Sequence, residues 1–144
     1  MLAILLLALP LPRLGVQDVP AVRDTAAFVR IANERNSETK KKLALDFEKK
    51  FPKSKHLPDV YIQLSRVLVS QSDFTTAKQY GDKAVAAVTR LEKTPPENAD
   101  NAWHEWMKTV ESSARSNAAW IKEMVTWQQE QFRSGVRGRP PRTP

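Results

Sequence analysis

The side chains of this sequence that could bind a metal ion are few. His104 and Glu105 open a pattern in which a second His, four residues after the first, would share a zinc ion on one helix face. Lys108 stands at that second position, and a single neutral imidazole does not hold zinc alone. The other His, His56, is distant in sequence, and there is no Cys. We therefore predict no metal site, cysteine nucleophile or disulfide.

Other catalytic patterns are also missing. A phosphate-binding loop needs closely spaced glycines, whereas the four glycines here are scattered, at positions 15, 81, 135 and 138. No Ser stands between the glycines of a nucleophile elbow. The carboxylates are spread over predicted outer helix faces, with no apolar surroundings to raise a pKa. We expect a protein that is not an enzyme and needs no cofactor.

The elements that would position any site are all predicted to be helices. Gly is scarce, and β-branched residues never alternate over the length of a strand. Capping residues, prolines and apolar periodicity predict five helices, at 20–35, 36–51, 58–70, 72–93 and from a capping box at Thr94 to Gly135. The expected fold class is all-α, in one domain at 20–134.

Residues 61–84 carry the most regular apolar spacing. At about 100° per residue, the first group falls within one narrow arc of a helix: Tyr61, Leu64, Ser65 and Leu68. A short polar break at 70–73 follows. A second group then returns at helical spacing: Phe74, Ala77, Gly81 and Ala84. This pattern predicts two helices packed as an antiparallel hairpin.

The same residues resemble a tetratricopeptide repeat (TPR), a helical hairpin of about 34 residues. Tyr61 and Phe74 stand at the aromatic positions of its two helices, and Ala77 and Ala84 at its two alanines. Gly81 departs from the pattern, which has a large residue there; a close approach of the helix at 58–70 would permit it. Upstream, residues 47–54 are similar to the Phe-x-x-x-Phe-Pro-x-Ser joint of repeats in bacterial periplasmic and outer-membrane-associated proteins.

The resemblance implies antiparallel TPR-like hairpins in a right-handed superhelix fragment, with the long C-terminal helix as a cap. It also implies a non-catalytic scaffold that binds a protein or peptide partner. The family's groove positions on the helix at 58–70 correspond to Asp59, Ile62, Arg66 and Val69. Arg66 would pair with a carboxylate of the partner. The alternative is that the long helix partly covers this face.

The long C-terminal helix contains all four Trp residues. A helix of this length is predicted to outreach a small helical body, so that it either folds back near residues 112–117 or leaves its distal half exposed. In the second case an apolar patch would form an oligomer interface: Trp120, Ile121, Met124, Val125 and Trp127. In the first case the same residues would pack in the core. Both alternatives stay open from the sequence.

The two ends of the chain differ from its body. Residues 1–19 form an apolar run and linker that predict a signal peptide, and hence export, periplasmic in a bacterium. No basic residue precedes the run, so the alternative is a buried helix end in a cytoplasmic protein. Residues 135–144 predict a disordered basic tail, which could contact an anionic membrane. Binding to nucleic acid is disfavoured, because no aromatic residue is interleaved among the tail's arginines.

Overall fold

The computed structural model describes residues 20–97, 99–135 and 138–144. Every regular element in those ranges is an α-helix, which confirms the all-α class: α1 (Pro20–Asn33), α2 (Ser37–Lys50), α3 (Leu57–Ser70), α4 (Phe74–Lys93) and α5 (Asn101–Ser134). The predicted signal segment at 1–19 lies outside the described residues.

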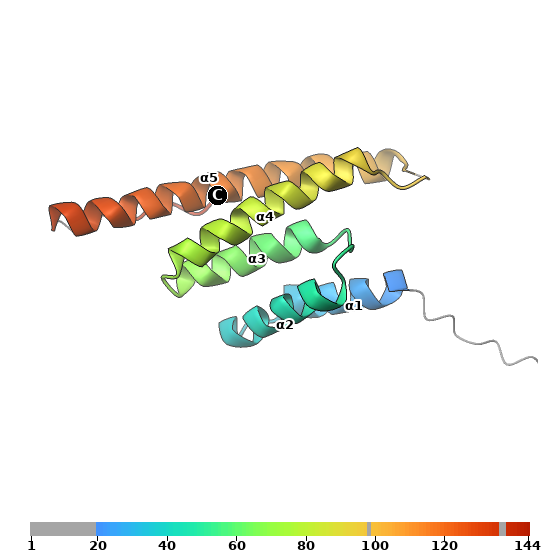
Figure 1. Ribbon diagram of the computed structural model, residues 1–144, viewed down its shortest axis with the longest axis horizontal. Helices are drawn as coiled ribbons and strands as arrows, with labels where there is room; N and C mark the ends of the chain where they lie inside the picture. The colour runs from blue at the N-terminus through green and yellow to red at the C-terminus, as the bar shows by residue number, and fades with distance from the viewer. Residues whose placement is uncertain (1–19, 98, 136–137) are drawn as a thin grey trace, which may run out of the picture.

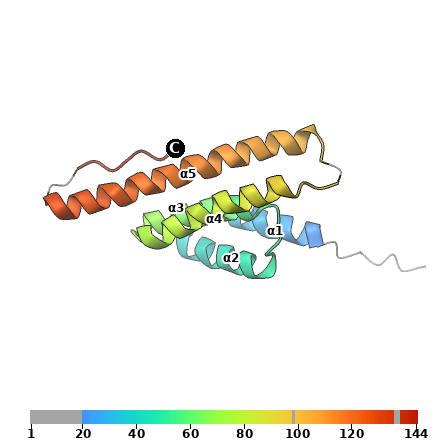
Figure 2. The same cartoon turned by 45° about the horizontal axis from the view of Figure 1, so that its top comes forward.

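Each helix runs opposite to the one before it (Figures 1 and 2). The pair α1 and α2 lies on one side of α3, whereas α5 lies on the far side of α4 and also packs against α3. The C-terminal end of α5 extends past α3 and α4 in both views. The long helix is continuous and does not fold back at residues 112–117.

Short polar side chains begin three of the helices. Asn36, Asp73 and Asp100 each accept a hydrogen bond from the backbone N–H three residues later, at 2.9, 3.1 and 2.8 Å. These bonds satisfy amide groups that have no partner within the helix. At the other end of α5, Gly135 adopts φ +66° and donates its N–H to the carbonyl of Gln131, a left-handed glycine cap.

The predicted start of the last helix at Thr94 is wrong by several residues. Thr94 instead closes α4, because its hydroxyl donates to the carbonyl of Arg90 at 2.9 Å. Pro95 and Pro96 follow, and a residue before proline is disfavoured in helical conformation. The helix α5 begins only at Asn101, after the side chain of Asp100 has capped it.

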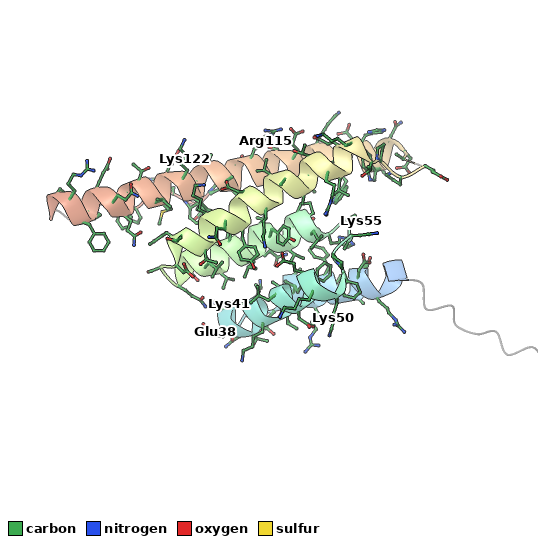
Figure 3. All side chains as sticks on the ribbon, viewed as in Figure 1. Glu38, Lys41, Lys50, Lys55, Arg115 and Lys122 are labelled. Carbon is green, nitrogen blue, oxygen red and sulfur yellow. The ribbon has the colours of Figure 1, made fainter. Side chains whose placement is uncertain are left out.

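The turn between α3 and α4 is tight. Ser72 adopts the left-handed conformation, with φ +61°, and the N–H of Asp73 bonds to the carbonyl of Leu68 at 2.9 Å. This arrangement terminates α3 and reverses the chain within three residues. At the same place the side chain of Gln71 bonds to Glu38 and Lys41, at 2.6 and 3.2 Å. Both of these residues belong to α2 (Figure 3). The turn is thereby tied to the start of α2.

One apolar core joins all five helices. Its largest side chains with less than 2% exposure come from every helix: Ile31, Phe47, Leu57, Leu64, Leu68, Val88 and Ile121. The helix α1 is only partly covered by its neighbours. Ile31 is buried and Phe28 half-buried, whereas Val29 is 47% exposed. Packing against α2 and α3 decides which face is inside.

Candidate functional site

The predicted groove on α3 is not an open groove in the structure. Ile62 is buried in the core, and Asp59 and Val69 are half-buried. Burial raises the pKa of the Asp59 carboxyl. Arg66 is exposed, but its Nε donates to Oδ1 of Asn117 in α5 at 3.0 Å. Part of this α3 face therefore contacts α5 and is not free to bind an external partner.

A buried polar contact holds α5 on α3. Asn117 and Ser65 are both fully buried. The amide of Asn117 donates to the hydroxyl of Ser65 at 2.9 Å, and this hydroxyl donates to the carbonyl of Ile62 at 2.8 Å. With Arg66 donating to Asn117 Oδ1, each polar group in the contact has a partner. A satisfied buried amide of this kind favours one register of helix packing over its alternatives.

Asn117 was not predicted to be a packing residue, because its amide side chain does not contribute to apolar periodicity. Apart from Trp120, the buried positions of α5 alternate by three and four residues: Met107, Val110, Ala114, Asn117, Ile121 and Met124. This spacing is typical of a seam between two packed helices. A strict three–four count from Met107 would have placed the Asn on that seam and marked it as a packing residue.

Of the two alternatives for the distal half of α5, core packing describes three of the five residues, although the helix does not fold back. Trp120, Ile121 and Met124 are 8%, 0% and 7% exposed within this single chain. Val125 and Trp127 are half-buried. An interface built from the first three would require α5 to leave the core, so these residues are not available on the surface of the folded chain.

Gly81 explains how α5 approaches α4 so closely. A Cβ at this position would lie 3.1 Å from Cδ1 of Ile121 and 3.6 Å from Cα of Ala118. The predicted close neighbour was the helix at 58–70, but the atoms within 4 Å of this Cβ position belong to Ala118 and Ile121 of α5. A large residue at position 81 would occupy the space that α5 fills.

A second polar cluster joins α2, α3 and α4 through Glu48. Its carboxylate accepts hydrogen bonds from Tyr61 at 3.0 Å, from Lys83 at 2.8 Å and from Tyr80 at 3.3 Å. Burial alone would raise the pKa of Glu48, but the bonds from Lys83 and the tyrosines lower it overall. Burial and the carboxylate raise the pKa of both tyrosines, which keeps them protonated as donors. The cluster is suited to holding helices together.

His56 connects α1 to the start of α3. Its ring stacks on Phe28, with centroids 4.6 Å apart and planes within 5°, and its Nε2 lies 3.2 Å from the hydroxyl of Thr25. Burial lowers the pKa of the imidazole; Asp24 opposes this shift and Lys55 adds to it. The folded protein therefore favours the neutral ring.

We expect the lowered pKa of His56 to make stability depend on pH. In the unfolded chain the His56 imidazole takes up a proton near pH 6.5, whereas in the folded chain it does so only at a lower pH. The contribution of His56 to the free energy of unfolding should be fully present above pH 6.5. It should be lost as the pH falls below 6.5 toward the pKa of the folded state. Thermal unfolding followed by circular dichroism between pH 8 and 5.5 would measure this fall. A His56→Gln variant should lose that part of the dependence, and an unchanged profile would contradict the assignment.

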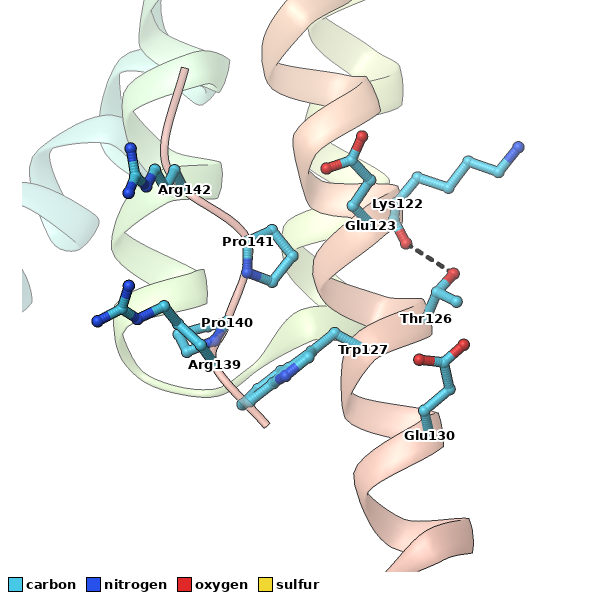
Figure 4. A pocket seen from close by; sticks show the side chains of 9 residues that line it. All are labelled: Lys122, Glu123, Thr126, Trp127, Glu130, Arg139, Pro140, Pro141 and Arg142. Atoms are coloured by element: carbon cyan, nitrogen blue, oxygen red, sulfur yellow. Dashed lines mark hydrogen bonds between the residues drawn. The ribbon is translucent and has the colours of Figure 1, made fainter. Parts of the chain in front are cut away.

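Among the described residues, the most exposed large apolar side chain lies at the end of α5. Phe132 is 83% exposed. Beside it lies a recess of about 530 Å³ between α5, the α3–α4 turn and the tail, lined in part by Phe74, Trp127, Gln131 and Gly138. On the other side of the tail a second recess, of about 620 Å³, is lined by α5 residues from Lys122 to Glu130 and by tail residues 139–142 (Figure 4).

The basic tail at 135–144 was predicted to be disordered, and its residues 138–144 form no regular secondary structure. Residues 138–144 are described, and they run back alongside α5 without helix or strand (Figure 2). Gly138 donates its N–H to Oε1 of Gln131. The side chains of Arg139 and Arg142 are exposed and point away from α5 (Figure 4).

The described ranges contain no group of three acidic or His side chains placed to hold a metal ion. Within the same ranges, no helix combines the length and the apolar character needed to cross a membrane. His104 is exposed on α5, next to the ring of Trp103. Protein-family models, curated proteins and solved structures were compared with the chain, and none of them matches it.

Proposed function

We propose that this chain is a non-catalytic protein-interaction scaffold built from TPR-like helical hairpins. The alternating direction of consecutive helices supports this assignment (Figure 1). So do the small buried residues that allow helices to approach closely, namely Ser65, Ala77, Gly81 and Ala84. The apolar leader at 1–19 supports export, with the periplasm of a bacterium as the site of action.

The observation that carries the proposal is the exposed end of α5. Phe132 is 83% exposed beside a recess whose walls include two further aromatic residues, Phe74 and Trp127. Aromatic side chains are enriched at the centres of protein interfaces, and exposed apolar patches mark contact sites. We therefore place the partner surface at the free end of α5 rather than on the predicted α3 face.

Site-specific photo-crosslinking would test this surface in the intact chain. A photoreactive phenylalanine analogue at position 132 should yield a discrete adduct with another protein, identified by mass spectrometry from native membranes and periplasm. The same analogue at Ser113, which is exposed on the middle of α5, is the matched control. Equal labelling from both positions, or none from position 132, would contradict the proposal. An adduct between two copies would favour a homo-oligomer instead.

An Arg66→Glu substitution would be an ambiguous test of partner binding at the predicted α3 face. Arg66 donates to Asn117, so its reversal of charge would also disturb the seating of α5. Loss of a partner could then follow from altered packing alone. Substitution at Phe132 avoids this ambiguity, because its side chain makes little contact with the core.

A further inference from the structure

The tail of this chain lies on α5 as an extended proline-rich segment. Pro140 lies beside the ring of Trp127, and the ring of Pro141 faces α5 (Figure 4). Among residues 138–144, Gly138 contributes a backbone hydrogen bond to α5, through Gln131. The remaining contact with α5 is therefore made mainly by side chains and proline rings.

A proline-rich segment suits a surface of this kind. Proline has no N–H to satisfy, and its fixed φ keeps the segment extended before it binds. Little conformational entropy is then lost on docking, and flat aromatic surfaces such as an indole ring are the usual partners of such segments. Trp127 provides that surface at the centre of the tail's path.

The tail leaves space and an unpaired hydrogen-bond donor on this surface. Recesses of about 620 and about 530 Å³ remain on its two sides. The indole Nε1 of Trp127 is buried without a hydrogen-bond acceptor. A longer or differently placed segment could fill a recess and direct a backbone carbonyl at this N–H, which the tail does not do.

Without the tail, the α5 residues that line the larger recess include two acidic side chains and one basic side chain, Lys122, and this net negative charge favours a basic ligand. Glu123 and Glu130 line the recess on one side of the tail. Arg139 and Arg142 point away from α5, and within the described ranges no ion pair joins them to either carboxylate (Figure 4). Both carboxylates are thus open to a basic residue of another segment.

We propose that the α5 surface around Trp127 binds an extended, proline-rich, basic segment of a partner protein, and that residues 138–144 occupy it as an internal competitor. This inference rests on the proposed scaffold function and narrows its partner class. Removal of the tail uncovers the site, and a segment that satisfies Trp127 and the two carboxylates displaces the tail in the intact chain.

The indole N–H signals in ¹H–¹⁵N NMR spectra would test this directly. Each of the four Trp residues gives one signal, and Trp127→Phe identifies the one at issue. Truncation after Gly135 keeps the cap of α5, and it should shift the Trp127 signal most. A synthetic peptide with the sequence of residues 138–144 should shift it back. The peptide should bind the full chain at least tenfold more weakly, because the attached tail competes.

A second peptide, with its three prolines replaced by alanine, is the matched control because it keeps both arginines. It should bind the truncated chain at least tenfold more weakly. Equal binding of both peptides would show that charge alone accounts for binding, and would overturn the proposal. A Trp127 signal that does not shift on truncation would also overturn it. If truncation shifts all four indole signals, the full-length double variant Pro140→Ala/Pro141→Ala takes the place of the truncated chain. The peptide of residues 138–144 must then shift the Trp127 signal of this variant in the same way. If the peptide does not bind but position 132 gives a specific crosslink, only the proposed proline-rich, basic ligand is overturned. If the peptide binds but position 132 gives no crosslink, the result counts against the scaffold function.

Discussion

Replacing Ile121 by Asp is expected to unfold the protein at neutral pH. Ile121 is fully buried, and its Cδ1 lies against the α4 backbone at Gly81. The substitution removes a buried aliphatic side chain, which costs about 2–5 kcal/mol, and adds a buried carboxylate without a partner. A loss above about 4 kcal/mol is large against a total stability of about 5–15 kcal/mol. Urea unfolding followed by far-UV circular dichroism would measure it.

Two controls separate core packing from an oligomer interface. Ile121→Val keeps the apolar character and should cost only about 0.5–1.5 kcal/mol. Phe132→Asp changes an exposed residue of the same helix and should alter stability by less than about 0.5 kcal/mol. A folded Ile121→Asp protein with normal helicity and a smaller sedimentation coefficient would contradict the packing described here and restore the interface interpretation.

Replacing Gly81 by Leu is expected to cost about 3 kcal/mol, although leucine is the better helix former. The first side-chain atom alone would lie 3.1 Å from Cδ1 of Ile121 and 3.6 Å from the backbone of Ala118. No room is left for the branched end of leucine unless α5 moves away from α4. Such a movement would also strain the contact between Asn117 and Ser65. Thermal unfolding and hydrogen exchange of α5 amides would record the loss.

The matched control is Ala86→Leu, on the exposed side of α4. It makes a similar change in the same helix without meeting α5, and should leave stability nearly unchanged. Gly81→Ala is an intermediate case, because its methyl group meets the flexible end of one side chain and gains about 1 kcal/mol of helix propensity. Equal stability of the Gly81→Leu and Ala86→Leu proteins would show that α5 does not pack on α4 at this point.

The tail and the helix end act on the same surface, which links the two proposals. Phe132 and Gly138 both line one recess, and Trp127 lines the recesses on both sides of the tail. The alternative in which the tail contacts an anionic membrane or nucleic acid uses the arginines that point away from α5. That binding would fall steeply with added salt, whereas a proline–indole contact would change little.

Local signals in the sequence determined the helices and most of their ends. Caps at Asn36 and Asp73 and the glycine at 135 act within one turn of the chain, so their effect is readable without the rest of the protein. The apolar arc of α3 was predicted for the same reason, and Leu64, Ser65 and Leu68 are buried as expected. The start of α5 was predicted wrongly because Thr94 lies between two helices and could cap either of them. It bonds to the end of α4, the helix that precedes it.

The covering of each face was decided only by the tertiary structure. Periodicity shows which side of a helix is apolar, but the helix that covers it comes from elsewhere in the chain. The sequence allows Ile62 in a groove and Trp120 in a patch, whereas both are buried in a fold where α5 packs on α3 and α4. The same holds for Gly81, whose meaning depends on Ala118 and Ile121 far along the sequence. Helix formation is a local equilibrium, whereas the choice of neighbours depends on non-local packing, to which small residues and one buried Asn contribute.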